Sequence, residues 1–244
     1  MESLVKFFGL IIFFCISCYG TAATIPDFPF VTVTGESTSK VKPNIVNIEF
    51  SILTFDKESN KANQLHQQTV GRLVEELKIL GVIPEDISSF EVNKRTTRDR
   101  DDRYNELSIL GYEVSQSFNV HLNNLSVYSE ITKLLLNTNN VENINSEFDT
   151  TKRQSIEAQL IKKAGQNAKE KAQQMALGLD VKIDSVFAFN DTGSFSSFFA
   201  TFGLNSGRIR FVAEQRRRVP PSTLFIPQFI EISKSINVVY RLEN

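Results

Sequence analysis

The segment VNIEFSI, Val46–Ile52, alternates apolar and polar residues without a break. A period of two is typical of a β-strand with one buried face and one face in water. A shorter strand is predicted at 31–34, and Lys42-Pro43-Asn44 lies between the two. We therefore expect these strands to form a hairpin.

A helical pattern follows this strand. We expect Asp56 to cap the helix and Gly81 to end it. Between them, apolar or small residues recur at spacings of three and four, which indicates an amphipathic helix. These residues are Ala62, Leu65, Thr69, Leu73, Leu77 and Leu80.

The same two periods continue along the chain. Further strands are predicted near 87–94, at 112–122, near 144–148, at 181–190 and at 230–242, and further helices at about 124–135 and 151–176. The last helix begins with Thr151 and Gln154 at capping-box spacing. The mixed-charge stretch Arg95–Arg103 is expected at a hairpin tip. The order ββαββαβαββ predicts an α+β fold, with a largely antiparallel sheet and three helices on one face.

Residues 1–22 have the composition of a secretory signal peptide. A lysine at position 6 precedes an apolar run from Phe7 to Tyr19, and small residues follow. This run is shorter than the roughly 20 residues that cross a bilayer core. We expect cleavage after Ala22, which leaves one domain at 23–244 in the periplasm or outside the cell, in association with the envelope. An uncleaved anchor is the alternative.

Charge and composition narrow the classes of function. The formal net charge is −1, which argues against general nucleic-acid binding. Both cysteines, Cys15 and Cys18, lie in the predicted signal peptide, so the mature chain has no disulfide and no thiolate nucleophile.

No pattern in the sequence indicates catalysis. The two histidines, His66 and His121, fall where the periodicity predicts solvent or the edge of an element, and no nucleophile is paired with either. Asp99, Asp101 and Asp102 alternate with arginines and lack the spacing of a calcium loop. We therefore predict no catalytic residue, no cofactor and no metal site.

The stretch at about 192–228 is unusually rich in Phe and Arg. Its aromatic cluster forms either an exposed contact surface or a cover over the domain's own core. Its basic cluster either contacts an anionic lipid surface, or pairs with acidic residues of a neighbouring subunit or simply faces water. The residues expected to contact a partner or membrane are Phe195, Phe198, Phe199, Phe202, Arg208, Arg210, Arg216, Arg217 and Arg218.

Several short motifs follow one another along the chain: Val31–Glu36, Lys42–Asn44, Gly81-Val82, Glu85–Ile87, Gly111–Val114, Leu125-Ser126, Lys171–Ala176 and the closing strand. In this order they resemble the SIMPL domain (DUF541) family, which includes YggE-like periplasmic proteins and a related periplasmic antigen. The likeness extends from about Phe30 to Leu242. It implies an α+β fold, an envelope location, ring-like homo-oligomers and a link to stress tolerance, and it implies no catalytic residues.

Two hypotheses follow for the function. The first is a non-enzymatic envelope protein that self-assembles, with a link to oxidative or envelope stress tolerance and a possible peripheral membrane contact. The second is a soluble monomeric module that binds a small molecule or a partner protein. An enzyme of unrecognised type ranks last.

Overall fold

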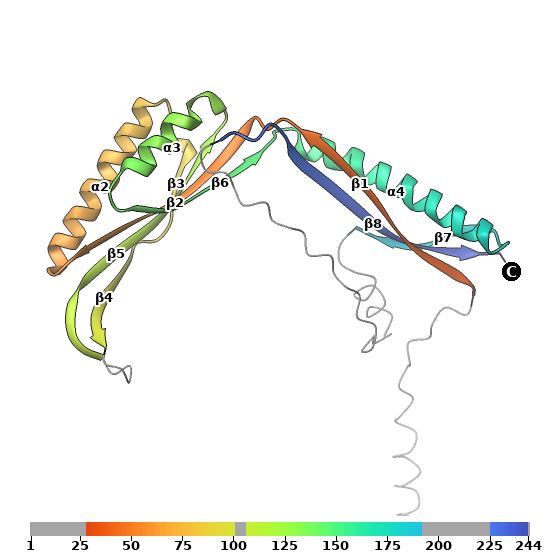
Figure 1. Cartoon of the computed structure of the whole chain (residues 1–244), viewed down its shortest axis with the longest axis horizontal. Helices are drawn as coiled ribbons and strands as arrows, with labels where there is room; N and C mark the ends of the chain where they lie inside the picture. The colour runs from red at the N-terminus through yellow and green to blue at the C-terminus, as the bar shows by residue number, and fades with distance from the viewer. Residues whose placement is uncertain (1–27, 101–105, 192–224, 244) are drawn as a thin grey trace, which may run out of the picture. The chain divides into compact units, whose positions relative to one another are not determined.

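A computed structural model of the chain describes residues 28–100, 106–191 and 225–243 (Figure 1). The strands are β1 Phe30–Val41, β2 Ile45–Asp56, β3 Ile87–Ser89, β4 Asn93–Arg100, β5 Glu106–Leu122, β6 Val141–Asp149, β7 Ile183–Asn190 and β8 Ile230–Leu242. The α-helices are α2 Ser59–Ile79, α3 Tyr128–Asn137 and α4 Arg153–Gly178, and two short 3-10 helices lie at Pro84–Asp86 and Leu125–Val127. The predicted α+β class is confirmed. None of these described helices is long and apolar enough to cross a membrane.

The described strands form two sheets, and the chain divides into two compact units. One unit has described residues 38–100, 106–159 and 225–233, and the other has 28–37, 160–191 and 234–243. The predicted hairpin between the first two strands is wrong, because β1 pairs with β8 while β2 pairs with β5 and β6.

The larger unit is built on a five-stranded sheet in the order β3-β5-β2-β6, with β4 also paired to β5. The pairings of β5 with β2, β3 and β4, and of β2 with β6, are antiparallel. The apolar positions of Val46–Ile52 are fully buried or nearly so, as the alternation predicts. Helices α2 and α3 supply the other half of this core and lie on one face of the sheet (Figure 1).

The smaller unit packs α4 against a three-stranded sheet in the order β1-β8-β7. Ala164, Ala168 and Ala172 are fully buried on α4, so the predicted small-residue stripe faces the sheet. Small side chains let the helix approach β1 closely. A Cβ at Gly35 would lie 2.0 Å from the carbonyl oxygen of Ala164.

Some predicted boundaries need correction. The strand expected near 87–94 is divided into β3 and β4, and β4 runs on to Arg100, so Arg95 lies in a strand and not at a hairpin tip. There Arg95 forms an ion pair with Glu113 of β5 at 2.6 Å. Glu58 occupies the N-cap of α2, and the Asp56 carboxylate instead accepts a hydrogen bond from the Glu58 amide at 2.8 Å.

Candidate functional site

The aromatic and basic residues that the sequence singles out, Phe195 to Phe202 and Arg208 to Arg218, lie outside the described residues. Their role in contacting a partner or a membrane stays a prediction. The described chain resumes at Phe225, whose side chain is 73% exposed.

Edge strands of a β-sheet present unpaired backbone groups that can pair with another chain, and charged side chains normally prevent this. In the described part of the chain, β4 is an edge strand that includes the charged residues Lys94, Arg95, Arg98 and Asp99. The edge strand β6 has Glu142 and Glu147.

The edge strand β7 lacks this protection. Its sequence is IDSVFAFN, and its only charged residue, Asp184, faces Arg241 of β8 at 3.8 Å. Val186, Phe187 and Phe189 remain 52%, 42% and 68% exposed. The ring of Phe187 packs edge-on against Phe28 with centroids 5.0 Å apart. An apolar edge that has no charged residue over 185–190 is suited to association with another polypeptide.

His66 lies in the interior and not at the surface, so its predicted position is wrong. It is 4% exposed on the buried side of α2, in the series Ala62, His66, Thr69, Leu73 and Leu77. Leu65, which the sequence reading placed inward, is 37% exposed. The helix thus buries a polar ring at a core position.

Hydrogen bonds determine the orientation of this ring. The Gln116 amide nitrogen donates to the carbonyl oxygen of Phe90 at 3.0 Å. The Gln116 Oε1 atom therefore faces His66 Nε2, at 3.1 Å. Among the described residues, none makes a hydrogen bond with the buried Nδ1 atom on the other side of the ring.

An open groove of about 340 Å³ runs beside His66, between α2 and β5. Its lining is apolar and amide-bearing apart from His66, and it includes no Asp, Glu, Lys or Arg side chain. The lining residues are Asn63, His66, Gln67, Val70, Gly71, Val92, Val114 and Gln116.

His121 has a different environment. It is half-buried near the end of β5, as expected for the edge of an element. Its Nδ1 atom lies 2.7 Å from the side-chain oxygen of Asn47, and its Nε2 atom lies 3.1 Å from that of Asn123. Both ring nitrogens of His121 thus have polar partners, whereas in His66 only Nε2 has one among the described residues.

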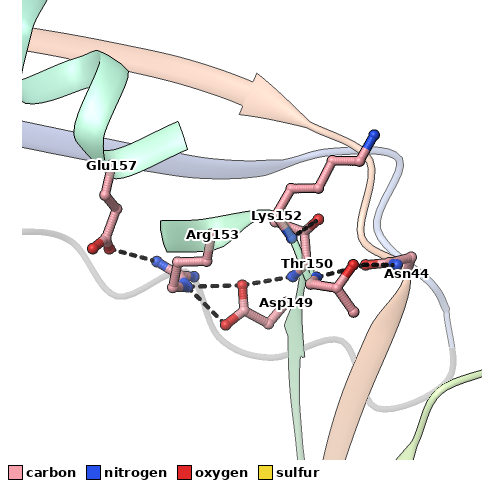
Figure 2. Close-up of polar contacts among 7 residues, drawn as sticks. Asn44, Asp149, Thr150, Lys152, Arg153 and Glu157 are labelled. Atoms are coloured by element: carbon pink, nitrogen blue, oxygen red, sulfur yellow. Dashed lines mark hydrogen bonds and ion pairs between the residues drawn. The ribbon is translucent and has the colours of Figure 1, made fainter. Parts of the chain in front are cut away.

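Within the larger unit, a polar network surrounds the first residues of α4 (Figure 2). The Nε group of Arg153 donates to both carboxylate oxygens of Asp149, at 2.8 and 2.7 Å, and these hydrogen bonds raise the pKa of Arg153. Asn44 joins the network because its Oδ1 atom accepts from the Thr151 amide at 2.9 Å. The Thr151 hydroxyl accepts from Asn44 at 3.0 Å. Because α4 begins at Arg153, Thr151 and Gln154 do not occupy the positions of the predicted capping box. These hydrogen bonds position the start of the helix.

Within the described ranges, no three His, Cys, Asp or Glu side chains are arranged so that they could hold a metal ion. The sequence reading missed two features, the uncharged edge of β7 and the buried His66. The first could have been noticed from the absence of charge over 185–190. Predicting the second requires knowing that α2 packs against β5, and no local sequence pattern contains this information.

In a comparison with known families, the family model SIMPL, described as "Protein of unknown function (DUF541)", matches residues 31–240. This confirms the resemblance that the short motifs indicate. No curated protein matches the chain significantly.

Proposed function

The chain belongs to the SIMPL (DUF541) family, whose function is unknown. We propose that it is a non-enzymatic protein of the cell envelope that assembles with copies of itself. The observation that supports self-assembly is the uncharged, apolar edge of β7. A second copy of the chain is present wherever the protein is made, so it can always pair with this edge. Its strand could extend the three-stranded sheet and cover the exposed Val186 and Phe189.

The envelope location rests on the pattern of residues 1–22. The SIMPL resemblance also implies a link to oxidative or envelope stress tolerance, which we include in the proposal. A peripheral membrane contact through Phe195 to Phe202 and the neighbouring arginines is a further part of it. These parts do not depend on self-assembly, and export has a test of its own.

Export is tested by expressing the full chain in a Gram-negative host and fractionating the cells. We expect the protein in the periplasmic or membrane fraction, with an intact mass that shows loss of residues 1–22. A chain that stays in the cytoplasm at its full mass of 27.6 kDa contradicts the proposed location.

Self-assembly is tested by the native mass of the purified exported chain, measured by light scattering. We expect a mass of several subunits, and a much smaller mass when Val186 and Phe189 are both changed to lysine, since charge on an edge strand opposes strand pairing. The matched control changes Ile79 and Ile83 to lysine, which are 83% and 53% exposed on the other unit, and should keep the large mass.

A third variant, with Phe198, Phe199 and Phe202 changed to serine, tests whether the aromatic cluster contributes to the same contact. A single-subunit mass for the unchanged chain contradicts self-assembly and favours the monomeric binding module. An assembly that all three variants retain places the contact elsewhere and removes β7 from the proposal.

A further inference from the structure

We propose that the contact between copies joins β7 of one chain to β7 of a second chain, as an antiparallel pair about a two-fold axis. This rests on the proposed self-assembly and adds which surface of the second copy takes part. Three features of the molecule support it: the capped edge of β1, the charged edges of the larger unit, and the apolar face of β7.

The edge of β1 is capped by side chains of α4. A strand at the edge of a sheet pairs on one side only, so the backbone groups on its other side need different partners. Lys171 Nζ donates to the backbone carbonyl oxygen of Thr34 at 2.9 Å. The backbone amide of Glu36 donates to Asn167 Oδ1 at 3.1 Å. A second chain that paired with this stretch of β1 would have to displace both contacts.

The edges of the larger unit are protected in another way. Strands β4 and β6 each carry several charged side chains, and β3 has only three residues. Charge on an edge strand opposes pairing with another chain. Of the strand edges in the described ranges, β7 is thus the one that a second copy can use over 185–190 without removing a cap or covering a charge. When both copies offer the same edge, the contact joins identical surfaces and has two-fold symmetry.

The exposed apolar side chains of β7 lie on one face of the sheet. Val186 is opposite Tyr240 of β8, and Phe189 is opposite Val238. Tyr240 and Val238 are two residues apart and both pack in the core against α4, so they share a face. The register shift between Val186 and Ala188 therefore places Val186 and Phe189 on this same face, although three positions separate them in the sequence.

The two-fold pairing suits these side chains. In an antiparallel pair that centres on 185–190, Val186 of one copy lies opposite Phe189 of the other, and symmetry repeats this contact. Pairs of a β-branched and an aromatic side chain stabilise neighbouring strands. The six residues 185–190 carry no charge, so no like charges meet across the axis.

Disulfide cross-linking tests this pairing directly. The two cysteines of the chain, Cys15 and Cys18, lie within residues 1–22, so an introduced cysteine is the only thiol of the processed chain. Two chains with different affinity tags are exported together, one with Val186→Cys and one with Phe189→Cys. After mild oxidation we expect a linked pair that carries both tags, because a disulfide requires Cα atoms within about 7 Å. Cysteines at 185, 188 and 190 of the second chain cover a shift in register.

A second experiment removes the caps of β1. Val186→Cys on one chain should not link to Thr32→Cys on the other while the caps are present. When Asn167 and Lys171 are both changed to alanine, β1 becomes available to β7 of a second copy. The link between positions 186 and 32 should then form, and the native mass should rise by about twofold or more, because head-to-tail contacts need not close.

The matched control changes Gln166 and Lys169 to alanine, which are exposed on the same helix, and should keep the mass of the unchanged chain. A single-subunit mass for the unchanged chain contradicts self-assembly itself. Four results overturn the β7 pairing alone: an assembly with an odd number of subunits, an assembly without links between the β7 strands, links from β7 to a capped β1, or a mass that loss of the caps leaves unaltered.

Discussion

Replacing Gly35 with alanine is expected to destabilise the unit formed by β1, β7, β8 and α4 by about 3 kcal/mol or more, at the upper end of overpacking effects. The new Cβ would lie 2.0 Å from the carbonyl oxygen of Ala164 and 2.6 Å from the amide nitrogen of Ala168. Both are backbone atoms, so no side-chain rotation can relieve the clash. The helix must move away from β1, and the small-residue contact through Ala168 and Ala172 is then lost.

The measurement is urea denaturation, with hydrogen exchange of β8 amides to report on this unit separately from the five-stranded sheet. The control is Gly165→Ala on α4, where a Cβ meets nothing within 4 Å. This change should stabilise the helix by up to about 1 kcal/mol. Equal stability of Gly35→Ala and the unchanged chain would show that β1 and α4 are not in close contact.

Replacing Tyr128 with alanine is expected to cost about 4 kcal/mol in the free energy of unfolding of the larger unit, the usual cost of removing a large buried aromatic ring. Tyr128 is fully buried in the core between the five-stranded sheet and its helices. Its ring packs edge-on against Phe148 with centroids 5.0 Å apart, and its hydroxyl bonds to Ser146 at 3.1 Å. One side chain thus joins α3 to β6.

Two further variants separate packing from hydrogen bonding. Tyr128→Phe keeps the ring and should cost only about 1 kcal/mol, the net value of one hydrogen bond. Phe90→Ala removes a ring that is 60% exposed, and it should change stability by less than about 1 kcal/mol. Chemical denaturation followed by circular dichroism ranks the three variants. Similar losses for Tyr128→Ala and Phe90→Ala would contradict the central position of Tyr128.

Helix and strand positions could be read from the sequence where one face of an element is buried along its length. The alternation over Val46–Ile52 identifies the inward residues of β2, and the alanines at every fourth position identify the inward side of α4. The helix predicted from Asp56 to Gly81 is observed at Ser59–Ile79. In each case the period of the backbone and the requirement to bury apolar surface lead to the same residues.

The same reasoning failed where a polar side chain takes a core position. Following apolar residues along α2 placed Leu65 inward, whereas His66 is the buried residue. The two positions are neighbours on the helix. The Gln116 side chain of β5 supplies the hydrogen-bond partner that a buried imidazole needs. Gln116 is 50 residues away in the sequence, so no local window includes this partner.

The sequence by itself determined the α+β class, the family and most element positions, because these depend on local periodicity and on short motifs. The tertiary structure alone decided which strands are neighbours. The Thr34 hydroxyl of β1 donates to Asn237 of β8 at 2.9 Å, across a separation of 203 residues, and β2 pairs elsewhere. Backbone hydrogen bonds are the same for any pair of strands, so partner choice, and with it the exposed edge of β7, arises only when side chains pack across the whole fold.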